Sequence, residues 1–80
     1  MFQMNHVLFA LLADLEAAKI PFTLARHRSD TILVALTLVG ERVEIDVFND
    51  GHMEVSRFQG DEGIVGDEAL VWTIIKQYLE

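Results

Sequence analysis

The sequence predicts an α+β fold: a four-stranded antiparallel meander with the N- and C-terminal helices packed on one of its faces. Three observations lead to this prediction. Apolar residues recur at helical spacing near both ends of the chain, and four β-branched or alternating segments lie between them. The links between these segments are only two or three residues long, which leaves no room for the crossover that parallel strands need. We therefore expect one domain over residues 1–80 with the element order α-β-β-β-β-α.

The first helix is expected over residues 5–19. Its apolar residues fall three or four positions apart, as they do on one face of a helix. They are Leu8, Leu11, Leu12 and Leu15. Asn5 is suited to cap the start of this helix. Pro21 ends the pattern, because the residue before a proline avoids helical backbone angles.

The four strands are expected over residues 22–28, 31–39, 42–48 and 52–58. The segment that follows them, residues 59–66, contains three glycines and is expected to form a loop. Asp67 is then suited to cap the second helix, which is expected to run to Tyr78 or Leu79.

The link between the second and third strands contains a glycine, which suggests a tight hairpin. A two-residue loop made of Gly40 and Glu41 would suit a type II′ turn, which needs glycine first. This loop would place Leu36 opposite Ile45 and would keep the apolar residues of both strands on one face.

The link between the third and fourth strands favours a three-residue loop over residues 49–51. In this register Val47 lies opposite Met53 and Ile45 opposite Val55, so that apolar residues share a face. Gly51 would then occupy the left-handed position of a bulged turn.

Acidic residues are concentrated in one part of the chain. Residues 41–68 contain nine acids and two bases, whereas the remaining residues contain four acids and four bases. This segment therefore accounts for the whole net charge of −7. Such a region repels nucleic-acid phosphates and anionic lipids and attracts cations or a basic protein. We expect a protein partner, and neither a nucleic acid nor a membrane.

Cysteine usage and the N-terminal segment bear on the compartment. The chain contains no cysteine, which excludes disulfides, thiolate metal sites and a cysteine nucleophile. The apolar stretch over residues 1–18 has no basic residue and is interrupted by Asp14 and Glu16, so we expect neither a signal peptide nor a membrane span. These features indicate a cytoplasmic protein.

The expected registers leave a second sheet face, opposite the helices, with carboxylates around apolar residues. Asp46 and Glu54 would lie opposite each other there, although like charges at this distance destabilise a sheet. Three interpretations remain open: a solvated face, a docking face with Leu33 and Phe48 as exposed anchors, or a cation site made of Asp46, Glu54 and His52. The candidate partner-binding residues are Leu33, Glu44, Asp46, Phe48, His52, Glu54, Asp61 and Glu62.

No arrangement of residues indicates catalysis or a bound cofactor. The three histidines lie on different predicted elements and lack the spacing of a zinc site, and no serine lies in a nucleophile motif. The only basic cluster consists of Arg26, His27 and Arg28. Such a cluster is typical of an edge strand, where charged side chains discourage pairing with another chain. We therefore expect no enzymatic activity, no catalytic residue, no metal and no cofactor.

The segment VEIDVFNDGHMEVSRFQGDEGI, residues 43–64, resembles segments of small bacterial α+β proteins of the immunity-protein kind. Proteins of that kind neutralise partner toxins. The resemblance implies a cytoplasmic binder with an acidic docking surface that opposes a basic toxin domain, and it implies no catalytic residue. The sequence thus predicts a non-enzymatic protein-binding module. The alternative is a homodimeric structural or adaptor subunit, joined through its apolar strands.

Overall fold

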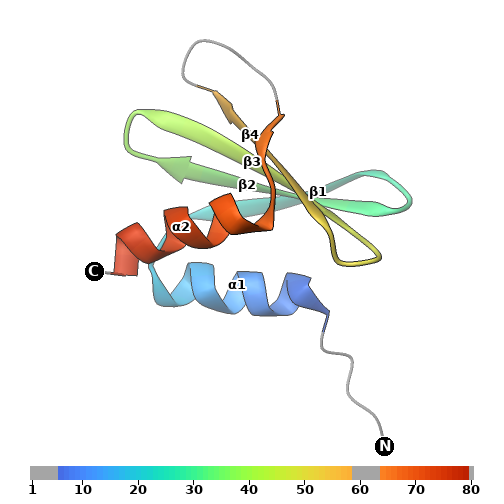
Figure 1. The fold of residues 1–80 in the computed structure, drawn as a ribbon, viewed down its shortest axis with the longest axis horizontal. Coiled ribbons are helices and arrows are strands. Elements are labelled where there is room, and N and C mark those ends of the chain that lie inside the picture. Colours follow the sequence, from blue (N-terminus) through green and yellow to red (C-terminus); the bar gives the residue numbers. More distant parts are fainter. Residues whose placement is uncertain (1–5, 59–63, 80) are drawn as a thin grey trace, which may run out of the picture.

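The computed structural model describes residues 6–58 and 64–79 of the chain. It has the predicted α+β layout, with a helix at each end of an antiparallel meander (Figure 1). The elements are α1 (Val7–Ala17), β1 (Phe22–Arg28), β2 (Thr31–Leu38), β3 (Glu41–Phe48), β4 (Met53–Phe58), β5 (Ile64–Gly66) and α2 (Glu68–Leu79). The sheet has five strands in the order β1-β2-β3-β4-β5, one more than the sequence predicts.

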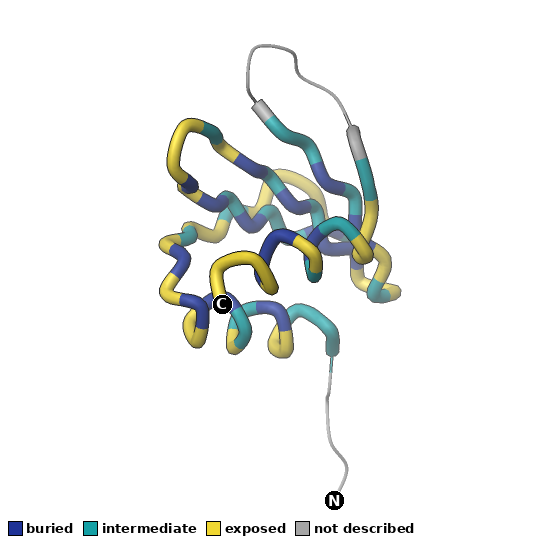
Figure 2. Tube along the Cα trace, turned by 60° about the vertical axis from the view of Figure 1, so that its left-hand side comes forward, coloured by how far each residue is buried: buried dark blue, intermediate teal, exposed yellow. Residues whose placement is uncertain are grey.

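The molecule has two layers, because α1 and α2 lie side by side on the same face of the sheet (Figure 1). Along β2 and β3 buried residues alternate with more exposed ones, as expected for strands with one covered face (Figure 2). The centre of the core is made of Leu11 and Leu15 from α1, the aliphatic residues of the strands, and Val71, Ile74 and Ile75 from α2. Burial of these side chains is the main stabilising contribution, at about 25 cal/mol per Å² of apolar surface.

The register between β2 and β3 differs from the predicted one by two residues. The loop consists of Val39 and Gly40, and Leu36 lies opposite Val43 rather than Ile45. Gly40 has a φ of +78° at the second loop position, whereas a type II′ turn would require the positive φ at the first. A shift of two residues leaves every side chain on its predicted face, because the period of a strand is also two.

The register between β3 and β4 confirms the prediction. Val47 lies opposite Met53 and Ile45 opposite Val55, around a loop of residues 49–51. Gly51 has the expected left-handed conformation, with a φ of +98°, and its amide donates a hydrogen bond of 2.9 Å to the Phe48 carbonyl.

The start of α1 is two residues later than predicted. His6 is the N-cap, and its Nδ1 accepts a hydrogen bond of 3.1 Å from the Leu8 amide. The same ring reaches the β3–β4 turn, where Nε2 donates to the Asn49 carbonyl over 3.0 Å. The two bonds fix the tautomer with the proton on Nε2. Asn5, the predicted cap, lies outside the described residues.

The end of α1 is a Schellman motif, in which Lys19 takes the left-handed position with a φ of +59°. The Ile20 amide donates to the Leu15 carbonyl, and the Lys19 amide donates to the Glu16 carbonyl. Ile20 and Leu15 both belong to the hydrophobic core, which supplies the apolar contact that accompanies this motif. The helix therefore ends at Ala17, two residues before the predicted end.

The connection from the sheet to α2 contains a short strand that the sequence does not predict. β5 pairs with Val55 and Ser56 of β4. Gly66 at its end passes so close to α2 that a Cβ added there would lie 2.9 Å from the Cβ of Leu70. Asp67 caps α2 as predicted, because its Oδ1 accepts a hydrogen bond of 3.1 Å from the Ala69 amide.

Candidate functional site

The face of the sheet opposite the helices, called the open face below, bears the predicted carboxylates. Its residues follow from the registers of β2, β3 and β4: Leu33, Ala35, Thr37, Arg42, Glu44, Asp46, Phe48, His52, Glu54 and Ser56. Leu33, Asp46 and Glu54 form one row across three strands, and Ala35, Glu44 and Ser56 form the next. The local reason is the alternation of polar and aliphatic residues along residues 42–47 of β3 and 53–56 of β4, which puts the aliphatic residues under the helices.

Phe48 is not the exposed anchor that the sequence predicts, because only 8% of its surface is accessible. The His52 ring stacks on the Phe48 ring with a centroid separation of 3.9 Å. The Arg28 guanidinium lies over the same ring, 5.1 Å from its centroid. The fold brings these groups together, since β1, β3 and the β3–β4 turn each contribute one. Leu33 is half-buried and remains as the partly exposed apolar residue at the centre of the open face.

The three carboxylates of the open face differ in their partners. Glu44 forms an ion pair with Arg42, which projects from the same face of β3, and the distance between Nη2 of Arg42 and Oε2 of Glu44 is 2.6 Å. Asp46 and Glu54 lie directly opposite each other, and within the described residues neither has an ion-pair partner. The row that contains Leu33 is therefore the most negative part of the open face.

Glu41 lies on the helix side of the sheet and is therefore not part of the open face. It lies on β3 rather than in the predicted loop, and its two oxygens accept hydrogen bonds of 2.8 and 2.6 Å from Arg57 of β4. These charge-assisted bonds hold the pKa of Glu41 below its ordinary value and raise the pKa of Arg57. The acidic segment of the sequence is thus divided between the two faces of the sheet.

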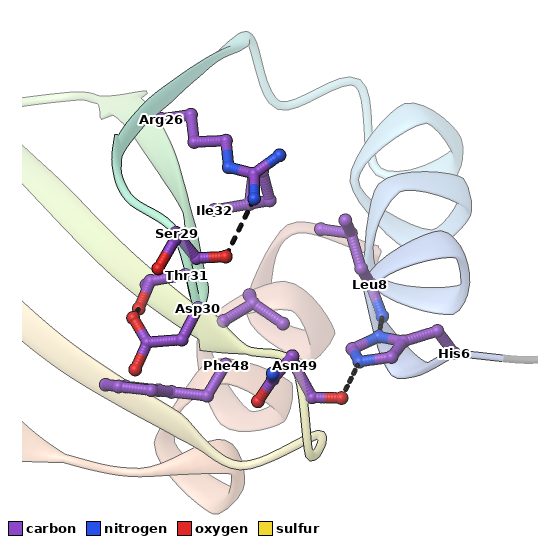
Figure 3. A pocket seen from close by; sticks show the side chains of 10 residues that line it. His6, Leu8, Arg26, Ser29, Asp30, Thr31, Ile32, Phe48 and Asn49 are labelled. Carbon is purple, nitrogen blue, oxygen red and sulfur yellow. Dashed lines mark hydrogen bonds between the residues drawn. The ribbon is translucent and has the colours of Figure 1, made fainter.

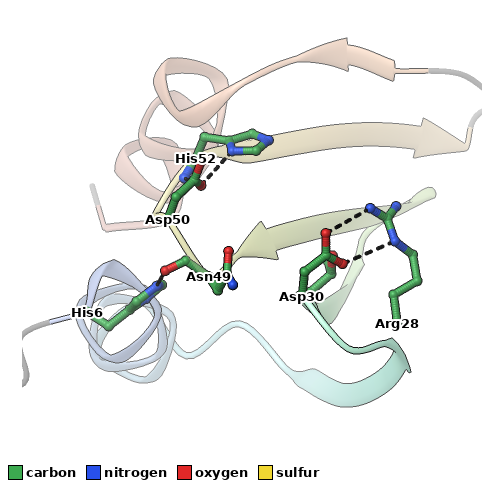
Figure 4. A network of polar contacts seen from close by, with 7 residues as sticks. His6, Arg28, Asp30, Asn49, Asp50 and His52 are labelled. Atoms are coloured by element: carbon green, nitrogen blue, oxygen red, sulfur yellow. Dashed lines mark hydrogen bonds and ion pairs between the residues drawn. The ribbon is translucent and has the colours of Figure 1, made fainter.

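The β3–β4 turn holds a further carboxylate next to His52 (Figure 4). Oδ1 of Asp50 accepts a hydrogen bond of 3.0 Å from the His52 amide and lies 2.6 Å from Nδ1 of the same residue. The backbone bond, followed by the ring contact, lowers the pKa of Asp50. Because a carboxylate only accepts, the His52 ring donates from Nδ1. Most of this histidine is open to solvent, with a side-chain exposure of 53%.

Two of the predicted docking residues, Asp61 and Glu62, lie outside the described residues. Over residues 6–58 and 64–79, no group of three or more histidines and acids has the geometry to hold a metal ion. Within that part of the chain no helix is long and apolar enough to cross a membrane.

The basic cluster of the sequence is divided by an irregularity in β1. The register of β1 against β2 shifts between Ala25 and Arg28. As a result His27 and Arg28 border a small hollow on the open face with Asp46. Arg26 instead borders a larger hollow on the helix side. Strand alternation alone separates Arg26 from His27, whereas the position of Arg28 on the open face depends on the bulge, for which sequence spacing gives no signal.

The hollow that Arg26 borders lies between the first turn of α1 and the turns β1–β2 and β3–β4 (Figure 3). Its volume is about 210 Å³. It is lined by apolar side chains from both layers and by polar groups of the two turns: Leu8, Ile32, Val47 and Phe48, with His6, Arg26, Ser29, Asp30, Thr31 and Asn49.

A second, more open hollow of about 450 Å³ lies between the start of β4 and the start of α2. It is lined by His52, Met53, Asp67, Glu68, Ala69 and Trp72. The Trp72 indole donates a hydrogen bond of 3.0 Å to Glu68 one turn earlier, which fixes the ring against this hollow. His52 lines this hollow and also lies on the open face. The hollow therefore continues from the open face around the β4 side of the sheet.

Comparison of the chain with protein families, with curated proteins and with solved structures finds no match.

Proposed function

We propose that this protein is a non-enzymatic binding module that docks a basic protein on the open face of its sheet. The observation that supports this most directly is the cross-strand pair Asp46 and Glu54, which has no ion-pair partner among the described residues. Two like charges at this distance destabilise the isolated domain, by up to about 1 kcal/mol. A cationic side chain of a partner would relieve that repulsion, so the arrangement favours a bound state over a free one.

The surroundings of the pair suit a protein partner. Leu33 lies in the same row and is half-buried, which gives the surface an apolar centre with charges around it. Trp72 and Glu68 extend the same surface around the β4 side, and a partly exposed aromatic residue beside a carboxylate suits an arginine or lysine side chain. A net charge of −7 would steer a basic partner toward the domain and raise its association rate.

A toxin-neutralising, immunity-like role in the cytoplasm of a bacterium is the specific form of this proposal. An immunity protein must bind a toxin tightly enough to block it, and it needs no chemistry of its own. Residues 43–64, which resemble such proteins, include residues 43–48 of β3 and the whole of β4, and therefore most of the open face.

The first experiment uses octalysine peptide as a probe and follows backbone amide resonances at low salt. We expect the largest shifts at residues 44, 46 and 54, and their loss at high salt, because exposed charges are screened beyond about 8–10 Å at physiological ionic strength. Shifts spread evenly over the chain, or largest on α1, would contradict the proposed docking face.

The second experiment compares two charge reversals in capture of partners from the source cell. The double variant Asp46→Lys with Glu54→Lys changes the open face, whereas Asp14→Lys with Glu16→Lys makes the same change in net charge on α1. We expect the first variant to lower the association rate of a captured basic protein at least tenfold, and the second to lower it far less. Equal effects of the two variants would mean that net charge, and not the open face, governs binding.

Self-association is the second candidate function, and one observation favours it. β1 lies at the edge of the sheet, so one side of its backbone has no neighbouring strand among the described residues. Leu24 of this strand is 51% exposed. Since β2 is paired on both sides, a dimer formed by strand addition would use β1. Sedimentation at micromolar concentration tests this: a dimer that Leu24→Lys dissolves would support it, and a monomer would exclude it.

A further inference from the structure

The hollow beside the first turn of α1 combines an apolar floor with one cationic group. Leu8 of α1 and Ile32 of β2 form this floor (Figure 3), together with Val47 of β3, which also lines the hollow. The hollow has a volume of about 210 Å³. An apolar cavity of about 150 Å³ accommodates a molecule of the size of benzene, so this one has room for about eight non-hydrogen atoms.

Arg26 is the cationic group, and two backbone carbonyls hold its guanidinium in place. Nη2 donates to the Ser29 carbonyl over 2.7 Å, and Nε makes a longer contact of 3.5 Å with the Arg28 carbonyl. A guanidinium has five N–H donors, so three donors remain after these two contacts. No carboxylate within the described residues lies at ion-pair distance from Arg26. The side chain is thus a fixed donor without a counter-ion at the edge of an apolar hollow.

Asp30 also borders the hollow, but its oxygens are occupied. Oδ1 accepts a hydrogen bond of 2.8 Å from the Thr31 hydroxyl, and Arg28 lies 3.4 Å from both carboxylate oxygens. The Thr31 bond and the Arg28 charge lower the pKa of Asp30, so that this carboxylate stays ionised at neutral pH. It cannot serve as the partner of Arg26, and its charge opposes a second negative group on any ligand.

We propose that this hollow binds a short aliphatic monocarboxylic acid, with its carboxylate on Arg26 and its hydrocarbon tail on Leu8, Ile32 and Val47. A guanidinium matches a carboxylate with two parallel N–H···O bonds, and the floor removes the tail from water. The site is independent of the docking function, because the residues proposed to contact the ligand lie on the helix side of the sheet. It also gives a role to Arg26 that differs from guarding an exposed edge.

The experiment uses 4-methylpentanoate, which has eight non-hydrogen atoms, and follows the methyl resonances of Ile32 and Val47 by NMR. We expect saturable shifts with a millimolar dissociation constant, as is usual for a ligand of this size. The neutral isostere 4-methylpentanamide should bind at least tenfold more weakly, because it cannot form the charged pair. Glutarate should also bind more weakly, because Asp30 repels its second carboxylate.

Two matched variants locate the charge that matters. Arg26→Gln should weaken 4-methylpentanoate at least tenfold, and Arg26→Lys should weaken it less, since lysine keeps the charge but loses the fork. Arg42→Gln on the open face should leave the affinity unchanged. The proposal is overturned by equal binding of the acid and the amide, by an affinity insensitive to Arg26→Gln, or by no saturation at tens of millimolar. The comparison of acid with amide uses the unaltered chain, so it holds whatever the variants do to folding.

Discussion

Asp46 of β3 lies directly opposite Glu54 of β4 on the open face. β3 is two strands away from β1, which forms one edge of the sheet. Repulsion between the two carboxylates lowers the free energy of unfolding, and the same two charges favour binding of a cation. Mutation can separate these two effects. We expect Asp46→Asn to stabilise the free domain by about 0.5 kcal/mol, because it removes a like-charge contact. Thermal unfolding at low salt measures this gain, which should shrink as salt screens the pair.

Glu44→Gln is the control for that prediction. It removes an equal charge from the same face, but this carboxylate is paired with Arg42. We therefore expect no gain in stability from it, or a small loss. Equal stabilisation by the two variants would show that the overall charge of the domain, rather than the cross-strand pair, sets the cost.

The ion pair between Glu41 and Arg57 predicts a loss of stability in acid. The pair lowers the pKa of Glu41 in the folded protein, so its contribution is present above the pKa of unfolded glutamate, about 4.3, and is lost as the pH falls through the folded value. Glu41 is 10% exposed, whereas Arg57 is 35% exposed and screened by water. We therefore expect Glu41→Gln to cost about 1 kcal/mol at neutral pH.

Urea unfolding at several pH values checks this expectation. The difference in unfolding free energy between the wild-type chain and Glu41→Gln should shrink as the pH falls below the pKa of unfolded glutamate, about 4.3. It should disappear below the lowered pKa of Glu41 in the folded protein, because protonation then removes the ion pair from the wild-type chain. Glu44→Gln again provides the control, since its ion pair with Arg42 is more exposed. A difference between wild type and Glu41→Gln that stays constant down to low pH would mean that shape, not charge, determines the effect.

Gly66 is predicted to tolerate no side chain. A Cβ at this position would lie 2.7 Å from Cδ2 and 2.9 Å from Cβ of Leu70, and the second atom cannot move without the helix backbone. We expect Gly66→Ala to destabilise the domain by about 1–3 kcal/mol, as overpacking does. Chemical denaturation measures this loss.

A double-mutant cycle with Leu70→Gly tests the cause of the Gly66 effect, because alanine at position 70 would keep the Cβ that lies 2.9 Å away. If the clash is responsible, the loss from Gly66→Ala should become much smaller in the Leu70→Gly background. Gly40→Ala is a useful contrast, because nothing lies within 4 Å of its Cβ position and only its φ of +78° opposes the substitution. Additive effects at positions 66 and 70 would refute the clash.

Lys19 is predicted to be a site of easy stabilisation. It takes the left-handed conformation at the end of α1, where a side chain costs about 1–2 kcal/mol relative to glycine. Glycine loses more backbone entropy on folding, so the expected net gain of Lys19→Gly is about 0.5–1 kcal/mol. Lys19→Ala should give no gain, because alanine keeps the Cβ. The melting temperatures of the two variants test this prediction. An equal rise in both would mean that loss of the lysine charge, and not relief of the left-handed conformation, stabilises the domain.

The sequence by itself determined both helices and four of the five strands, and which face the residues of β2, β3 and β4 occupy. These features follow from periods of 3.6 and 2 that are local in the chain. Asp67 as cap and Gly51 in the three-residue turn were also predictable, because the conformation at each is decided by a few neighbouring residues. Asp46 and Glu54 were predicted as opposite neighbours for the same reason, since their register depends on that one turn.

Only the tertiary structure decided how distant side chains meet. The β2–β3 register could shift by two residues without changing any face, so hydrophobic pattern could not distinguish Leu36 opposite Ile45 from Leu36 opposite Val43. Phe48 is buried because β1 and the β3–β4 turn bring Arg28 and His52 onto its ring, and a bulge in β1 turns Arg28 toward the open face, away from Arg26. These contacts depend on packing between strands, for which the local period of a sequence has no signal.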